Sequence, residues 1–189
     1  MTGGAGYVGS HVLKHLGDGD VTPIVADDLS TGHSDAVLWG HLAVGDCRDA
    51  AFLDRVFSEH RFDAVVHLAG KVVATESVSQ PLVYYGHNAE ATLRLLEAMD
   101  RHSVEQLIFS STAAVYGNSA GTRVDESAPL DPINPYGASK MMAERMITDY
   151  AAASNLRYVI LRYFNVAGAD PDGRLGQRAL LRRVQGTGG

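Results

Sequence analysis

Residues 2–11 of the sequence read TGGAGYVGSH, and this stretch decides the expected fold. Gly3, Gly6 and Gly9 stand at three-residue steps, and a helical pattern follows through Leu16. Glycines at such steps permit a tight turn, close approach of a phosphate to the backbone, and close helix packing. The amino end of the helix supplies N–H groups and a positive dipole to a pyrophosphate. The stretch predicts a dinucleotide site; a flexible amino-terminal loop is the alternative.

An acidic residue further along the chain supports the same site. Asp27 ends an apolar strand predicted over residues 21–26, where a carboxylate can hold the hydroxyls of an adenosine ribose. The same charge would repel the extra phosphate of NADP, so NAD is the expected cofactor. A fingerprint of this kind should follow a buried strand, but only Met1 and Thr2 precede Gly3. We therefore expect the first strand of the sheet to be missing.

Segments rich in β-branched residues alternate with helical patterns along the rest of the chain. Further strands are predicted over residues 42–44, 62–69, 107–110 and 158–161, and helices over residues 49–60, 81–102 and 136–152. This alternation is typical of a parallel sheet with helices on both faces, which binds ligands beyond the carboxyl ends of its strands. We expect a Rossmann-like, doubly wound α/β domain over residues 1–172. The arginine-containing residues 173–189 would form a basic tail.

Composition and charge exclude several classes of protein. The 189 residues are 46% apolar and 20% charged, which favours one compact domain over disorder. The net charge of −6 opposes binding to nucleic acid. No apolar run is long enough to cross a membrane, and no secretory signal is present. The one cysteine, Cys47, suits a reducing compartment, so a soluble cytoplasmic protein is expected.

A second group of residues carries the expected acid–base chemistry. Tyr136 and Lys140 stand four residues apart on one face of a predicted helix. A free tyrosine has a pKa of about 10, and a nearby ammonium group favours the phenolate, so the pair forms a plausible general base. Thr112, after the strand over residues 107–110, offers a hydroxyl to a substrate alcohol. The alternatives are a solvated helix face for the pair and a capping role for Thr112.

The remaining candidate ligands and nucleophiles predict no further chemistry. His11 and His15 are four residues apart but lack an adjoining glutamate or a third ligand, so no metal site is expected. His67 lies inside an apolar strand, as a hydrogen-bonded core histidine would. Cys47 is expected to pack or to contact the cofactor rather than to act as a nucleophile.

Taken together and in order, these segments resemble the extended short-chain dehydrogenase/reductases, and within them the branch that epimerises UDP-hexoses. The matching segments are TGGAGYVGSH, DDLSTGH, GDCRD, HLAGK, SSTAAVYG, NPYGASK and LRYFNVAGADPDGR. The resemblance runs from Thr2 to about Gln177. Residues 178–189 do not match the family's pattern, so we expect the carboxyl-terminal substrate domain to be absent.

The resemblance implies an NAD cofactor and a UDP-sugar substrate. It places at the cofactor Gly3, Gly6, Tyr7, Val8, Gly9, Asp27, Asp28, Asp46, Cys47, Leu68, Ala69, Gly70, Lys71, Asn88, Tyr136, Lys140 and Phe164. It places at the substrate Thr112, Tyr136 and Asn165. By the same resemblance Tyr136 is the base, and Lys140 holds the nicotinamide ribose and lowers the tyrosine pKa. Thr112 bridges to the sugar hydroxyl.

The implied reaction is NAD-dependent epimerisation at C4 of a UDP-hexose, between UDP-glucose and UDP-galactose, through a transient 4-keto sugar. Ala113 and Ala114 stand where a related dehydratase carries an acid, which argues against dehydration. Two alternatives stay open: another nucleotide-sugar epimerase or reductase on the same scaffold, and an inactive fragment that only binds dinucleotide. The helices over residues 81–102 and 136–152 are implied to form a homodimer interface.

Overall fold

The computed structural model of the chain describes residues 1–19, 21–118 and 123–178. The strands assigned in these ranges are β1 (Ile24–Asp27), β2 (His41–Val44), β3 (Val65–His67), β4 (Gln106–Ser110) and β5 (Arg157–Leu161). β1 pairs with β2, and β4 lies between β3 and β5, with every pairing parallel. The predicted α/β fold with a parallel sheet is confirmed, although the strand expected over residues 62–69 is shorter.

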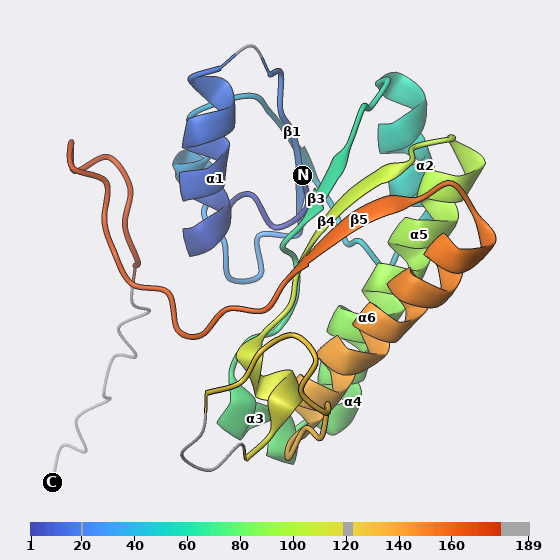
Figure 1. Ribbon diagram of the computed structural model, residues 1–189. Coiled ribbons are helices and arrows are strands. Elements are labelled where there is room, and N and C mark those ends of the chain that lie inside the picture. The colour runs from blue at the N-terminus through green and yellow to red at the C-terminus, as the bar shows by residue number, and fades with distance from the viewer. Residues whose placement is uncertain (20, 119–122, 179–189) are drawn as a thin grey trace, which may run out of the picture.

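Helices are the other regular elements of the described residues. They are α1 (Tyr7–Gly17), α2 (Ala50–Glu59), α3 (Ala74–Ser79), α4 (Pro81–Tyr84), α5 (Ala91–Arg101) and α6 (Pro135–Ala153), with 3-10 turns η1 (Ser34–Ala36) and η3 (Ala113–Tyr116) and a π-helix η2 (Tyr85–Glu90). α1 lies on one side of the sheet and α2, α5 and α6 on the other (Figure 1). No helix in the described ranges has the length and apolar character needed to cross a membrane.

The centre of the sheet is built differently from the expectation. We expected the first strand of the sheet to be missing, but residues 1–3 occupy the place between β1 and β3. Thr2 forms parallel bridges with both Ala26 and His67. The Gly3 N–H donates to the Ala26 carbonyl at 2.9 Å. Because these backbone bonds reach both neighbours, residues 1–3 join the two parts of the sheet and lead directly into the glycine turn.

The two faces of the sheet are covered unequally within the described residues. Leu107 and Phe109 of β4 are buried in a core that includes side chains of α2, α5 and α6. Side chains alternate between the faces of a strand, so the neighbouring positions point the other way. There Ile108, Val159 and Leu161 are 38%, 52% and 44% exposed. The expected helical cover on both faces is therefore present at α1 but not over β4 and β5.

The long helix predicted over residues 81–102 is interrupted by the π-helix η2. Turns of this kind are rare and occur frequently at functional sites. Asn88 of η2 is 1% exposed. Its side chain accepts from the Lys71 N–H at 2.8 Å, and donates to the Lys71 carbonyl at 3.1 Å and to the Ser139 hydroxyl at 2.9 Å. Through Asn88 the turn thus connects the loop after β3 to α6. These contacts are between residues far apart in the sequence, so helical periodicity does not reveal them.

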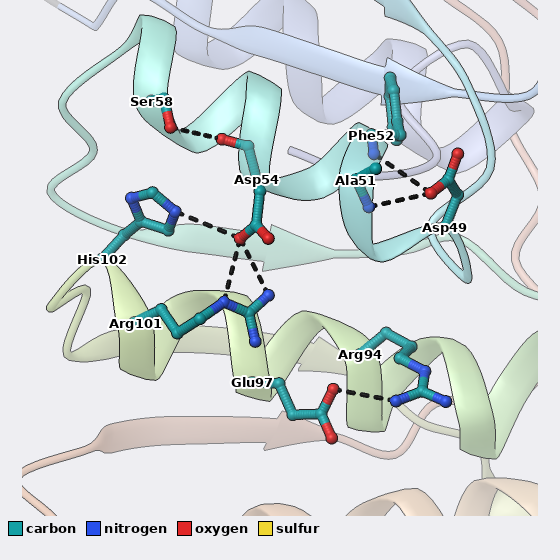
Figure 2. A network of polar contacts seen from close by, with 9 residues as sticks. All are labelled: Asp49, Ala51, Phe52, Asp54, Ser58, Arg94, Glu97, Arg101 and His102. Carbon is teal, nitrogen blue, oxygen red and sulfur yellow. Dashed lines mark hydrogen bonds and ion pairs between the residues drawn. The ribbon is translucent and has the colours of Figure 1, made fainter.

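An exposed polar network joins α2 to α5 (Figure 2). The Asp49 side chain caps α2 by accepting from the Ala51 and Phe52 N–H groups at 2.9 and 3.3 Å. Further along α2, one carboxylate oxygen of Asp54 accepts from Arg101 Nη2 at 2.9 Å and lies 3.3 Å from His102 Nε2. The network lies on the rim of the packed layer, with the side chains of Asp54 and Arg101 each 43% exposed.

Candidate active site

A cavity of about 920 Å³ lies at the carboxyl ends of the strands. Its wall combines the glycine turn, the start of α6, and residues that end or follow β1, β2, β3, β4 and β5. This is the edge at which an open parallel sheet binds its ligands. The cavity therefore lies where the sequence predicts the site.

The glycine turn needs its glycines for space as well as for conformation. Gly3 has a φ of +70°, and a Cβ atom there would lie 2.5 Å from the Ala69 nitrogen. A Cβ atom at Gly9 would lie 2.1 Å from the Gly3 carbonyl oxygen. α1 begins at Tyr7, and the Gly6 that caps it offers no side chain to the first N–H groups. Since Gly6 and Tyr7 line the cavity, the helix end is available to an anionic group such as a pyrophosphate.

Asp27 joins this turn to the end of β1. Its carboxylate accepts from the Ala5 N–H at 3.0 Å and from the Leu29 N–H at 2.9 Å. Burial raises the pKa of Asp27, and the two backbone hydrogen bonds oppose that rise. Two carboxylate oxygens have about four acceptor positions, so Asp27 can still accept from ribose hydroxyls. Asp27 and Asp28 both line the cavity.

α6 delivers the predicted acid–base pair. The Asn134 side chain caps the helix by accepting from the Gly137 N–H at 2.9 Å, which places Tyr136 in the first turn and Lys140 one turn later. Lys140 is 2% exposed and donates to the Ser110 carbonyl at 2.9 Å. Burial lowers the pKa of Lys140 to about 8. The sequence therefore places an ammonium group in the floor of the cavity.

The electrostatics of Tyr136 differ from the expectation. Burial raises the pKa of Tyr136, the Thr112 side chain opposes this rise, and the nearby Tyr163 raises the pKa further. Lys140 is not among the groups that shift this pKa, and its ammonium group donates to the Ser110 carbonyl. Thr112 also caps η3 by accepting from the Ala114 N–H at 3.1 Å, so its capping role and its place in the cavity coexist.

The cavity brings together nearly all of the residues predicted for the site. Those that line it are Gly3, Gly6, Tyr7, Val8, Gly9, Asp27, Asp28, Asp46, Cys47, Leu68, Ala69, Gly70, Lys71, Thr112, Tyr136, Lys140, Phe164 and Asn165. Asn88 does not line it, because its side chain lies below the surface and serves the Lys71 backbone and Ser139. In this structure Asn88 shapes the wall of the cavity.

Other residues of the cavity were not predicted. Ser30 and Thr31 line it and belong to the DDLSTGH segment, so that motif could have indicated them. Tyr163 lines it and hydrogen-bonds through its hydroxyl to the Ser110 side chain. Tyr163 precedes the predicted Phe164 directly, which is a usable signal. His87 also lines the cavity, but no motif marks it.

Nucleophilic and metal chemistry find little support in the described residues. Cys47 is 6% exposed, and burial raises the pKa of its thiol to about 12, which disfavours the reactive thiolate. His67 lies in the core between the hydroxyls of Thr2 and Thr92, at 2.6 and 3.1 Å, as expected for a hydrogen-bonded core histidine. Across the described ranges no three His, Cys, Asp or Glu side chains are grouped to hold a metal ion.

The sequence of the whole domain also matches a known family. The family model described as "NAD dependent epimerase/dehydratase family" matches residues 1–185. The chain belongs to this family. That membership confirms the resemblance given by the motifs, and it accounts for the glycine turn and the Tyr136–Lys140 pair on one cavity.

Relatives of this epimerase/dehydratase chain are longer than the chain itself. It is 53% identical over 178 residues to the UDP-glucose 4-epimerase of Azospirillum brasilense, covering 94% of this chain and 51% of that protein. A crystal structure of UDP-glucose 4-epimerase from Brucella ovis in complex with NAD superposes with a TM-score of 0.91 at 45% identity, covering 94% of this chain and 55% of the other. The structure of the UDP-glucose 4-epimerase from Bifidobacterium longum in complex with NAD+ and UDP superposes with a TM-score of 0.87 at 36% identity, covering 93% of this chain and 56% of the other. The chain thus spans about half the length of the relatives it matches.

Proposed function

We propose that this chain binds NAD along the cavity and forms the cofactor-binding part of a UDP-hexose 4-epimerase that interconverts UDP-glucose and UDP-galactose. One observation carries the proposal: a single cavity is lined by both the glycine turn and the Tyr136, Lys140 and Thr112 group. The relatives named UDP-glucose 4-epimerase, and the solved structures with NAD and UDP, support the choice of cofactor and substrate.

The residues present fit a dinucleotide. Gly3 and Gly9 allow the backbone of the turn to pack tightly, since a side chain at either position would collide with neighbouring backbone, and the open end of α1 faces the cavity. The pyrophosphate would lie there, with the adenosine ribose on Asp27 and the adenine near Cys47. The opposite end, formed by α6 and the residues after β4 and β5, would hold the nicotinamide and the sugar. Lys140 supplies the hydrogen-bond donor for the nicotinamide ribose.

The chain's own groups supply the proton chemistry. NAD, when bound, would supply the hydride-transfer chemistry at C4 of the sugar. Tyr136 would take the proton of the 4-hydroxyl at its phenolate oxygen and later give it back. Thr112 would hold the same hydroxyl through its side-chain oxygen. Because burial raises the pKa of Tyr136, we expect cofactor binding to bring the ammonium of Lys140 into a position that favours the phenolate.

Substitution of the tyrosine tests the assignment. Tyr136→Phe should abolish interconversion of UDP-glucose and UDP-galactose while leaving the dissociation constant for NAD within a factor of a few. Tyr158→Phe is the matched control, because Tyr158 lies on β5, outside the cavity lining, and should keep full turnover. Turnover is followed by product formation without net NADH. Retained turnover in Tyr136→Phe would refute its role as the base, and turnover only of a different UDP-sugar would refute the choice of hexose.

We further propose that α4, α5 and α6 form a homodimer interface and that the protein is cytoplasmic. Leu82, Leu93 and Met142 on these helices are 82%, 40% and 46% exposed. Apolar side chains exposed over neighbouring helices are typical of an interaction surface. Sedimentation should give a dimer for the unmodified chain and a monomer for Leu82→Glu; a monomer for both would overturn the dimer.

A further inference from the structure

A buried polar network lies directly behind the candidate active site. Tyr136, Lys140 and Glu144 follow one another at four-residue steps on α6, so they share one face of that helix. Tyr136 and Lys140 line the cavity, whereas Glu144 does not. Glu144 is nevertheless only 3% exposed. A carboxylate in that position needs partners that compensate its burial.

Two side chains, Ser111 and Arg162, donate hydrogen bonds to the Glu144 carboxylate. The Ser111 hydroxyl donates to one oxygen. Arg162 donates to both oxygens, from Nε at 3.0 and 3.1 Å and from Nη2 at 2.6 Å. The other terminal nitrogen of Arg162 donates to the Tyr116 hydroxyl at 2.8 Å, and the guanidinium lies 5.1 Å from the centre of the Tyr116 ring. Both oxygens of the carboxylate are thus engaged by a two-point contact of fixed geometry.

Each member of the network adjoins a segment of the active site. Ser111 immediately precedes Thr112, and Tyr116 ends η3, the turn that Thr112 caps. Arg162 follows β5 and is separated from Phe164 by a single residue, Tyr163, both of which line the cavity. Glu144 lies one turn after Lys140. The network therefore joins the three segments that supply the nicotinamide end of the proposed site.

Stability alone does not explain a buried ion pair in this position. The desolvation of two charges offsets much of their attraction, and well-packed apolar residues in their place are often neutral or stabilising. What the charged pair supplies is a defined contact geometry, because the planar guanidinium presents its donors in a rigid fork that matches a carboxylate. Reacting groups need such placement, since a displacement of about 1 Å can cost roughly 100-fold in rate.

We propose that Glu144 and Arg162 are positioning residues that hold α6 against the ends of β4 and β5. They thereby keep Lys140, Tyr136 and Thr112 in the arrangement that binds the nicotinamide end of NAD and turns over the sugar. The inference rests on the proposed function. Neither residue touches the cofactor or the substrate; both act through the segments they join.

The test replaces the ion pair without leaving a single buried charge. The double variant Glu144→Leu/Arg162→Met should fold with a melting temperature close to that of the unmodified chain. Its dissociation constant for NAD should rise about tenfold, the loss expected for one charge-assisted hydrogen bond. Its dissociation constant for AMP, which reaches only the Gly3–Gly9 and Asp27 end of the cavity, should stay unchanged. The kcat for UDP-glucose should fall about 100-fold with a smaller change in KM.

A control pair on the same helix separates positioning from general stability. Arg145 and Asp149 form an exposed ion pair, with side chains 77% and 61% exposed, beginning one residue after Glu144. Arg145→Ala/Asp149→Ala should leave both NAD and AMP binding unchanged. Unchanged NAD binding and kcat in the Glu144/Arg162 double variant would overturn the inference, and equal loss of NAD and AMP binding would assign the network to folding.

The two proposals fail in different ways. If the unmodified chain binds NAD but turns over no UDP-sugar, the epimerase proposal fails, while the contrast between NAD and AMP in the double variant still decides the role of the network. If the unmodified chain does not bind NAD, both proposals are overturned.

Discussion

Two polar networks in this domain use similar groups in different surroundings. In one, Glu144 and Arg162 meet between α6 and the ends of β4 and β5, with side chains only 4% and 18% exposed. In the other, Asp54 and Arg101 meet between α2 and α5, where both side chains are 43% exposed (Figure 2). Water screens the exposed pair and can replace either partner, whereas the buried pair has only its protein partners. The same kind of ion pair therefore fixes the relative position of its two segments at Glu144 and Arg162, and contributes little to stability at Asp54 and Arg101.

The sharpest way to break this contrast is to remove one arginine at a time. Arg162→Met leaves the Glu144 carboxylate buried without its cation and should lower the free energy of unfolding by about 3–5 kcal/mol. Arg101→Met leaves Asp54 in contact with water and should give no resolvable change. Urea unfolding of the two variants measures both values. A small effect at Arg162, equal to that at Arg101, would show that the burial of the network has no energetic consequence.

Lys140 is a third buried charge beside Glu144 and Arg162, and its burial can be measured through the pH dependence of stability. Its pKa is about 8 in the folded chain, against about 10.4 in an unfolded one. Between these values the unfolded state binds more protons at this side chain, so the contribution of Lys140 to stability should rise with pH over this window, by an amount on the order of 3 kcal/mol. Below pH 8 both states are protonated, and the cost of burying the charge persists.

Unfolding of Lys140→Met across pH 7–10.5 checks this assignment. The free energy of unfolding of the unmodified chain relative to Lys140→Met should rise with pH, because Cys47 and the other titrating groups are common to both and cancel. Relative to Arg101→Met it should stay constant. A constant difference between the unmodified chain and Lys140→Met would contradict the burial of a charged Lys140.

The smallest expected effect compares two helix caps. Asn134 caps α6 and Asp49 caps α2, and each accepts from backbone N–H groups of the first turn. Asn134→Ala and Asp49→Ala should each cost about 1 kcal/mol. Only Asn134→Ala should also weaken NAD binding, because Tyr136 lies in the first turn of α6. Equal NAD affinity in the two variants would show that the start of α6 tolerates displacement.

Local sequence signals account for much of the site. The glycine steps, the acid that ends β1, and the Tyr136–Lys140 spacing each depend on residues close together in the chain. Such residues share a turn or a helix face whatever the rest of the molecule does. The carboxyl ends of parallel strands then bring these local groups to one edge. This is why the structure places the predicted cofactor and substrate residues, Asn88 excepted, on one cavity.

Signals that depend on distant partners were absent from the pattern. In the π-helix, Asn88 forms hydrogen bonds with the Lys71 backbone and the Ser139 hydroxyl, which lie 17 and 51 residues away in the sequence. Lys140 donates to the Ser110 carbonyl, 30 residues before it, a partner that its spacing from Tyr136 does not reveal. Helical periodicity and charge spacing in the sequence do not change with the presence of such partners, so they cannot predict these contacts.

By itself the sequence determined the α/β order of elements, the parallel sheet, the glycine turn and the acid–base pair, because each follows from short-range spacing and from the burial of apolar residues. Tertiary structure decided how residues 1–3 fill the centre of the sheet, which face of β4 and β5 is covered, and where the buried charges find partners. Those outcomes depend on backbone hydrogen bonds and ion pairs between segments far apart in the chain. The strength of these hydrogen bonds and ion pairs depends on their burial, and burial occurs only once the segments have packed.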